Sequence, residues 1–282
     1  MAEIEFSAMN SATEAVARRS MDDQIEIARF KPWQASFTHR RTYANAYREC
    51  AAEVLLDGPD GVQRRASLFW DGGHTWRLRW APDLLGAWQW RTRSDDPGLD
   101  GHHGRLFCVD GGRRGAPTTW PDHPWHLRYQ DGSPMYLFGD TQWAATTTRL
   151  EDGCDRAAVA ADAARRASQG FNLINIKLQA WGVNEGGDAW QRASPDDRIA
   201  ADEPLNPAFW QEVDRRLAFL EDLGLTAFLF IAWQKPDSAA QLVSWDRFPD
   251  QAARRRFARY VAARYAAGNT LVCLAGEWKP GR

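Results

Sequence analysis

The hydrophobic pattern of this chain changes its period near residue 112, and this change constrains the fold more than any other feature. Before it, apolar and polar residues alternate, so that Trp76, Leu78 and Trp80 share one face of an extended segment. Turn sequences rich in Gly, Pro and Asp recur at short intervals. Residues 25–112 are therefore predicted to form an antiparallel, immunoglobulin-like β-sandwich, preceded by a weakly ordered or helical leader over residues 1–24.

After residue 112, compact apolar segments alternate with helical stretches. Each apolar segment is predicted to be a strand buried on both faces, and the four segments cover residues 135–143, 171–179, 225–233 and 270–278. The helical stretches between them cover residues 155–169, 207–223 and 250–267, each followed by a glycine that can end a helix. Strand and helix in alternation predict parallel βα units joined by right-handed crossovers.

Two architectures satisfy this alternation, a doubly wound open sheet and a (β/α)8 barrel. An open sheet usually carries a glycine-rich phosphate loop after an early strand, and the sequence has neither GxGxxG nor a Walker sequence. We therefore favour the barrel. A complete barrel needs about 250 residues, so residues 113–282 are expected to form an incomplete (β/α)8 TIM barrel of about the first four strands.

Composition excludes several classes of protein. With 44% hydrophobic and 26% charged residues, the chain is neither disordered nor fibrous, and 35 Lys plus Arg against 37 Asp plus Glu give no net field that attracts nucleic acid. We expect no nucleic-acid partner, no membrane partner, no metal and no cofactor, and four unlinked cysteines. The start lacks the zones of a secretory signal, which predicts a cytoplasmic protein as written; a start further upstream could carry an export signal.

The 15 tryptophans suggest carbohydrate, because a sugar ring stacks on a flat indole, although sandwich cores also use Trp. In a barrel the site lies at the carboxyl ends of the strands. The candidate substrate-binding residues at those ends are polar groups interleaved with indoles, namely Asp140, Trp143, Lys177, Gln179, Trp181, Trp233 and Gln234.

Glu277 is the candidate catalytic residue, because it directly follows Ala275 and Gly276 at the end of the last apolar segment. Burial there would raise the pKa of its carboxyl group and suit it to donate a proton, as the acid/base of a glycosidase does. Asp140 has two interpretations. It could contact substrate, or its carboxylate could bond backbone N–H groups of a tight turn.

Four sequence motifs carry a family resemblance. FWDGGHTWRLRWAPDLLGAWQWRTRSDDPGLDGHHG resembles the β-sandwich domain of apiosidase-like glycoside hydrolases, and HLRYQDGSPMYLFGDTQW, GFNLINIKLQ and LAGEW resemble the first half of their catalytic barrel. The resemblance implies a retaining hydrolase with its acid/base at the end of strand four, which Glu277 matches, and its nucleophile at the end of strand seven. It runs from about residue 25 to the end.

The leading hypothesis is thus the N-terminal portion of a retaining glycoside hydrolase that acts on plant or microbial polysaccharide side chains. Its nucleophile would be missing from this chain, which alone would be inactive. The alternative is a non-catalytic carbohydrate-binding protein with a Trp-lined sugar site, and a third interpretation makes the sandwich a structural spacer. If the half barrel is the real product, its two unpaired edge strands favour a homodimer.

Overall fold

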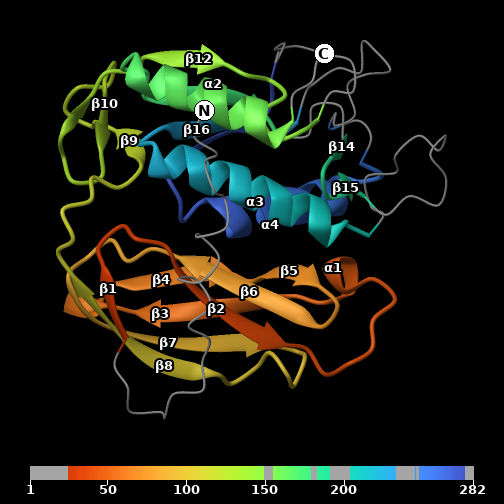
Figure 1. The fold of residues 1–282 in the computed structure, drawn as a ribbon. Coiled ribbons are helices and arrows are strands. Elements are labelled where there is room, and N and C mark those ends of the chain that lie inside the picture. Colours follow the sequence, from red (N-terminus) through yellow and green to blue (C-terminus); the bar gives the residue numbers. More distant parts are fainter. Residues whose placement is uncertain are drawn as a thin grey trace.

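The structure, a computed structural model, describes residues 25–148, 155–178, 183–190, 204–232, 245 and 248–276. Figure 1 shows two stacked parts, a β-sandwich and a βα unit. The helices of the βα unit lie between the sandwich and the parallel strands of that unit, or in front of those strands. A small antiparallel sheet connects the two parts, with β9 (Pro117–Thr119), β10 (Leu127–Tyr129) and β11 (Pro134–Met135) in the order β11-β10-β9. No helix among the described residues is both long and apolar enough to cross a membrane.

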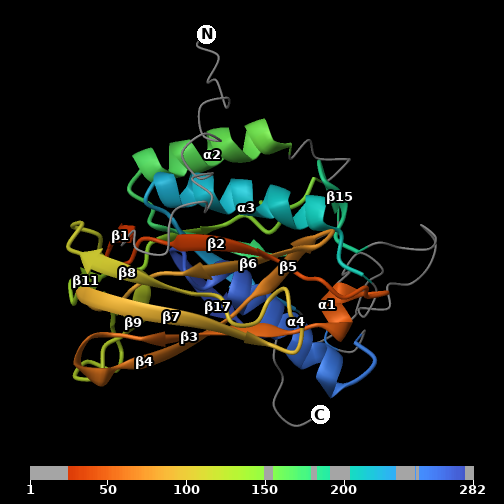
Figure 2. The same ribbon diagram turned by 90° about the horizontal axis from the view of Figure 1, so that it is seen from below.

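The sandwich consists of a larger and a smaller sheet. In the order of the sheet, the larger one contains β1 (Ile25–Ala28), β8 (His103–Val109), β7 (Gly86–Ser94), β3 (Ala52–Asp57) and β4 (Gln63–Ser67). The smaller one contains β2 (Trp33–Thr38), β6 (Thr75–Trp80) and β5 (Phe69–Gly72). Pairing is antiparallel except between β1 and β8. The strand axes of the two sheets are roughly aligned with each other (Figure 2), as in the aligned packing of β-sandwiches.

Alternating side chains fill the space between the two sheets. Trp76 and Leu78 of β6 are buried as the period of two predicts, and Trp88 of β7 is fully buried. The Trp88 indole packs edge to face on Trp80, with ring centroids 4.8 Å apart, and its N–H donates to the Leu84 carbonyl at 3.0 Å. These tryptophans therefore belong to the sandwich core and not to a sugar site. A short helix, α1 (Ala46–Glu49), and a 3-10 turn, η2 (Pro59–Gly61), interrupt the strands.

The βα unit contains four parallel strands and three long helices in alternation. In chain order these are β12 (Gly139–Thr141), α2 (Arg156–Ser168), β13 (Leu173–Lys177), α3 (Pro207–Asp222), β16 (Thr226–Phe230), α4 (Gln251–Tyr265) and β17 (Thr270–Cys273), with a small hairpin of β14 (Val183–Asn184) and β15 (Gly187–Asp188) before α3. The sheet order β12-β13-β16-β17 repeats the chain order. Since each crossover advances the sheet in the same direction, right-handed connections place their helices on one face.

Local sequence explains where the three helices begin and end. The side-chain oxygens of Asp155, Asn206 and Asp250 each accept a hydrogen bond from a backbone N–H of the first turn. Past the ends of α2 and α3, Gly170 and Gly224 have φ of 85° and 75°, a left-handed conformation that glycine adopts without strain. The predicted helical stretches are confirmed. The buried apolar faces include Phe209, Val213, Leu217 and Leu220 on α3, and Ala253, Phe257, Val261 and Tyr265 on α4.

One expectation from the sequence is wrong. The strands of the βα unit are not buried on both faces, because β12 is largely exposed and β17 is half-buried apart from the exposed Val272, while β13 and β16 each contain two half-buried residues. Two arginines of the helices, Arg216 and Arg264, are buried. Each of these guanidinium groups is neutralised by carboxylates, which is what allows a charge to leave water.

Candidate active site

The carboxyl ends of the four parallel strands meet at one edge of the βα unit. Each strand is paired in parallel with its neighbour, and backbone hydrogen bonds continue beyond the strand ends. The Leu178 N–H donates to the Phe230 carbonyl at 3.1 Å, and the Gly276 N–H donates to the Ala232 carbonyl at 3.0 Å. The chain therefore leaves β13, β16 and β17 at the same edge, which we call the carboxyl edge.

Half-buried or exposed side chains form two rows on one face of this sheet. The first row contains Thr141, Asn175 and Phe228, which are partners in the strand register. The Asn175 amide Nδ2 donates to Thr141 Oγ1 at 3.1 Å, so β12 and β13 are joined by a side-chain hydrogen bond as well as by the backbone. This row supplies amide and hydroxyl groups that can bond the hydroxyls of a sugar.

The second row lies nearer the carboxyl edge and combines a cation, aromatic rings and a thiol. Lys177 is the register partner of Phe230, and Phe230 is the partner of Cys273. The Trp143 indole lies edge to face against the Phe230 ring, with centroids 5.2 Å apart, and Trp143 is 37% exposed. An accessible indole is suited to stack on a sugar ring, while the amino group of a lysine on the neighbouring strand could donate to its hydroxyls.

The predicted site residues divide into three groups in the structure. Trp143 and Lys177 are brought together, since both adjoin Phe230. Asp140 lies on β12 in register with the buried Ile174, and its Oδ2 lies 2.6 Å from Nε of Arg166 on α2. The remaining predicted residues lie outside the described residues, namely Gln179, Trp181, Trp233, Gln234 and the catalytic candidate Glu277.

The contacts of Asp140 direct its carboxylate toward α2. Its Oδ1 accepts a hydrogen bond of 2.8 Å from the Thr141 backbone N–H, while its Oδ2 pairs with Arg166. Both oxygens thus have partners within the protein, as in the scaffold interpretation of this residue. Direct contact between Asp140 and substrate stays a prediction.

Sequence reasoning missed Asn175 and Phe230. Both belong to segments that were interpreted as buried on both faces, so only residues beyond the strand ends were considered. The signal that could have found Asn175 is its position two residues before Lys177, because residues i and i+2 of a strand share a face. The same spacing relates Phe228 to Phe230, whose rings lie 4.8 Å apart.

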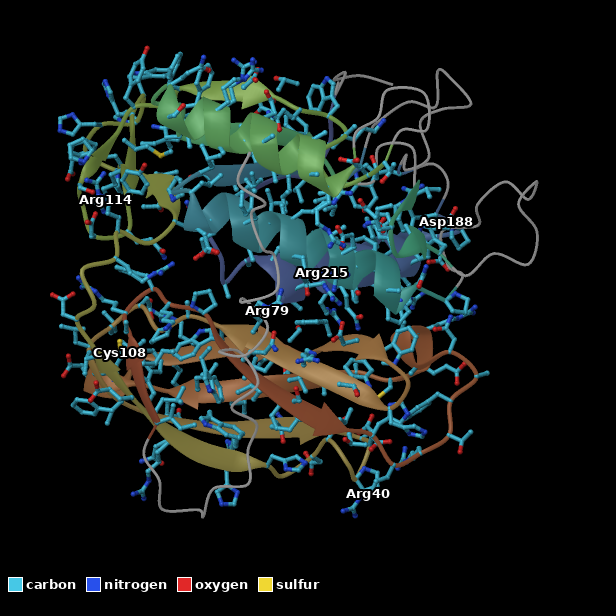
Figure 3. All side chains as sticks on the ribbon, viewed as in Figure 1. Arg40, Arg79, Cys108, Arg114, Asp188 and Arg215 are labelled. Carbon is cyan, nitrogen blue, oxygen red and sulfur yellow. The ribbon has the colours of Figure 1, made fainter. Side chains whose placement is uncertain are left out.

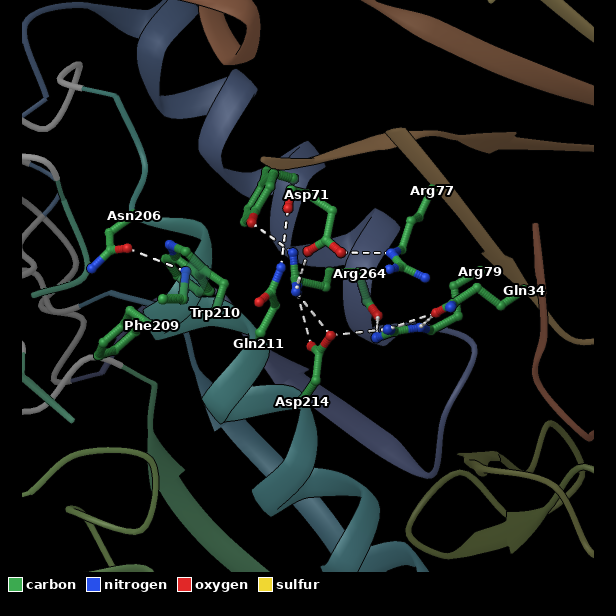
Figure 4. Close-up of polar contacts among 12 residues, drawn as sticks. Gln34, Asp71, Arg77, Arg79, Asn206, Phe209, Trp210, Gln211, Asp214 and Arg264 are labelled. Atoms are coloured by element: carbon green, nitrogen blue, oxygen red, sulfur yellow. Dashed lines mark hydrogen bonds and ion pairs between the residues drawn. The ribbon is translucent and has the colours of Figure 1, made fainter. Parts of the chain in front are cut away.

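A second cluster of charges lies at the boundary between the sandwich and the βα unit (Figure 4). Arg264 of α4 is fully buried and donates to Asp71 of β5 at 2.8 Å and to both carboxylate oxygens of Asp214 at 2.8 Å. Arg79 of β6 bonds the same Asp214 at 3.0 Å and the Arg264 backbone carbonyl at 2.7 Å. These bonds join β5 and β6 to α3 and α4.

The electrostatics of this boundary cluster are those of a structural network. Burial alone would raise the pKa of Asp214, but attraction to Arg264 and Arg79 outweighs it and lowers that pKa. Burial opposes the charge of Arg264, yet attraction to Asp214 raises the pKa of the guanidinium well above its usual value. Asp214 and Arg264 therefore stay ionised at neutral pH, which suits them to fix the two parts together and not to exchange protons during a reaction.

The fold is similar to that of glycoside hydrolases. A crystal structure of a protein from Bacteroides vulgatus ATCC 8482, described as a candidate glycoside hydrolase, matches 90% of this chain with a TM-score of 0.70 and 20% sequence identity. A glycoside hydrolase family 5 structure from the same strain matches 58% of this chain and 33% of its own, with 15% identity and a TM-score of 0.43. This chain spans 50% of the first structure's chain.

The family follows from the sequence models. Residues 122–282, more than half of the chain, match the model of the apiosidase-like catalytic domain, and residues 26–95 match a domain of unknown function, DUF5060. The chain belongs to the apiosidase-like family. No curated protein matches it.

Proposed function

We propose that this chain carries the sandwich and the first four strands of the (β/α)8 barrel of a retaining glycoside hydrolase, with Glu277 as general acid/base. The observation that carries the proposal is the carboxyl edge, where strands in chain order bring Trp143, Lys177 and Phe230 together. A barrel requires such sequential parallel strands, whereas an open doubly wound sheet reverses its order. The division into residues 25–112 and 113–282 is part of this proposal.

The position of Glu277 in the sequence supports its role. It directly follows Gly276, whose N–H donates to the carbonyl of Ala232, the residue before Trp233. The proposal places the Glu277 carboxyl group at the carboxyl edge, where it would protonate the glycosidic oxygen and later deprotonate water. Asn175 and Lys177 would bond sugar hydroxyls, and Trp143 would stack on the ring.

The nucleophile of a retaining pair lies about 5–5.5 Å from the acid/base. Asp140 is the only carboxylate on the four described strands of the sheet, and its oxygens contact Arg166 and the Thr141 N–H. The proposal therefore assigns the nucleophile to a later strand than these four. In that case the 282-residue chain binds oligosaccharide and shows no turnover, and the substrates are plant or microbial polysaccharide side chains.

Binding and turnover, measured together on the purified chain, test this function. We expect calorimetry with pectic oligosaccharides to detect binding that Trp143→Ala weakens about tenfold. Trp125→Ala is the matched control, because that indole is 92% exposed and lies in the β9–β10 connection. Release of aryl groups from aryl glycosides is expected to stay at background. Absence of any saccharide binding would overturn the proposal.

Turnover by the chain would have a different meaning. If it vanished in Glu277→Ala and returned with azide, Glu277 would be the acid/base, and the nucleophile would have to lie within this sequence.

The alternative of a non-catalytic carbohydrate-binding protein is favoured by the same Trp143 and Phe230 pair, which needs no acid/base to hold a sugar. It predicts no turnover even in a protein with a complete barrel and an intact Glu277. Pairing of edge strands β12 and β17 with a second copy also stays a proposal.

A further inference from the structure

A cavity of about 800 Å³ lies between the sandwich and the βα unit, away from the carboxyl edge. Its walls come from β4 and β6, from residues 113–116 and from the segments that follow α3 and α4. Gly224 and Asn269, which line it, precede β16 and β17. The cavity therefore opens at the amino ends of the parallel strands, whereas the proposed active site is at their carboxyl ends.

Positive charge dominates the lining of this cavity. Six arginines face two carboxylates, Asp83 and Glu221, and the six are Arg64, Arg65, Arg79, Arg113, Arg114 and Arg259. Like charges brought this close repel one another, so such an excess is a cost to the folded protein unless an anion binds there. A chain with a formal net charge of -2 has no general surplus of cations that would account for it.

Three of these arginines are already neutralised. Arg64 pairs with Asp83 at 2.7 Å, Arg113 pairs with Glu221, and Arg79 pairs with Asp214. These pairs use both carboxylates of the cavity.

The other three arginines come from three different elements. Arg65 of β4 is 3.4 Å from Glu53 with its side chain 68% exposed, and Arg114 lies over the Tyr129 ring at 5.5 Å. Arg259 of α4 is exposed and pairs with no carboxylate of the described residues. Figure 3 shows Arg79 at the boundary of the two parts and Arg114 on the connection between them. Arg114 and Arg259 thus have no carboxylate partner among the described residues, and Arg65 pairs only with Glu53, which lies outside the lining of this cavity.

The charged surface extends beyond this cavity. A second cavity of about 1140 Å³ shares Arg65, Ser67 and Arg259 with the first. Among the described residues it adds four arginines, Arg48, Arg93, Arg255 and Arg256, and three carboxylates, Glu53, Asp95 and Asp100, so arginines outnumber carboxylates here as well. The two cavities therefore form one continuous groove along the boundary, which we call the arginine groove. Its extent suits an oligomer with repeated negative charges better than a single small anion.

We propose that the arginine groove binds an anionic polysaccharide whose sugars carry carboxylate or sulfate groups. Planar guanidinium groups bind such oxyanions through two parallel hydrogen bonds, and rings such as Trp80 and Tyr129 of the lining offer apolar surface to the sugar. This site goes beyond the proposed glycosidase function. The first cavity of the groove lies at the opposite end of the parallel strands from the proposed active site, and the second cavity continues along α4.

Titration with charged and neutral oligosaccharides tests the inference. The probes are an oligomer of alginate for carboxylate, an oligomer of dextran sulfate for sulfate, and neutral dextran, at about 50 mM salt where screening is weak. We expect the alginate or the dextran sulfate oligomer, or both, to bind, and neutral dextran not to bind. The double variant Arg65→Ala with Arg259→Ala should weaken that binding about tenfold or more. Raising the salt concentration should weaken it in the unmodified protein and have a smaller effect in the variant.

The matched control removes the same two charges elsewhere. Arg41 and Arg105 are exposed and line neither cavity, so Arg41→Ala with Arg105→Ala should change binding less than about twofold. Equal losses in both double variants, or no binding of either anionic probe, would overturn the proposal. Tighter binding of single-stranded DNA than of both anionic oligomers would overturn the assignment to polysaccharide. Trp143→Ala should leave this binding unchanged, so failure here is separable from failure of the proposed function.

Discussion

Replacement of Arg264 by Met removes a charge that is fully buried between the two parts of the molecule. The guanidinium donates to Asp71 and Asp214 and, at 2.9 Å, to the Tyr260 hydroxyl. Met fills a similar volume, so the main loss is electrostatic. Breaking a buried ion pair on one side costs about 3–5 kcal/mol because a charge is left without compensation.

The structure places the expected cost near the lower end of that range. Asp71 keeps its second partner, Arg77, at 2.5 Å, and Asp214 keeps Arg79 at 3.0 Å. Neither carboxylate is therefore wholly orphaned. We expect a loss of about 3 kcal/mol in the free energy of unfolding and a fall in melting temperature of about 6–12 °C.

Urea unfolding at neutral pH, followed by tryptophan fluorescence, measures this free energy. Arg105→Met, at an exposed arginine, is the control and should change it by less than about 0.5 kcal/mol. Asp214→Asn combined with Arg264→Met should cost less than the sum of the two single changes, since both remove the same bonds. A loss of under about 1 kcal/mol for Arg264→Met is what an exposed pair gives, and it would refute the buried network.

Two further predictions concern the sandwich and the hairpin before α3. Burial, and then repulsion by His74, lower the pKa of His39, whose Nδ1 accepts a hydrogen bond of 3.1 Å from the Trp76 indole. The unfolded chain therefore binds a proton at this residue more readily than the folded protein does. The free energy of unfolding should consequently fall as the pH drops from about 7 to about 5. Melting curves of His39→Gln should show a shallower fall, and an equal slope would contradict this reasoning. Gly186→Ala would place a Cβ 2.2 Å from the Ala208 carbonyl oxygen, so the loss expected in urea unfolding is about 1–3 kcal/mol, and an unchanged midpoint would be the opposing result.

Periodicity predicted the elements whose burial repeats regularly along the chain. Leu78 on a strand and Val213 on a helix are buried where the periods of two and 3.6 place them. Asn206 begins its helix through the side-chain bond that its position before Pro207 indicates. In these cases the residues that decide the structure are close in the sequence.

The boundary network could not be predicted in this way. Asp71 and Arg264 are separated by 193 positions, and an arginine on an amphipathic helix has the same local pattern whether it faces water or a carboxylate. The candidate site was predicted in part. The ends of the strands indicated Trp143 and Lys177, while the direction of the Asp140 side chain depends on Arg166 of a helix that follows it. Glu277 lies outside the described residues, and its role stays a prediction.

The shared network at the boundary has a consequence for building chimeric enzymes. A foreign sandwich grafted onto this βα unit would meet Asp214 and Arg264 without the matching charges of β5 and β6. Recombination between relatives should therefore succeed when both sides of the contact are inherited from one parent, and fail when the crossover falls between them. The two parts, although distinct in architecture, are therefore expected to be inherited together from one parent in functional chimeras.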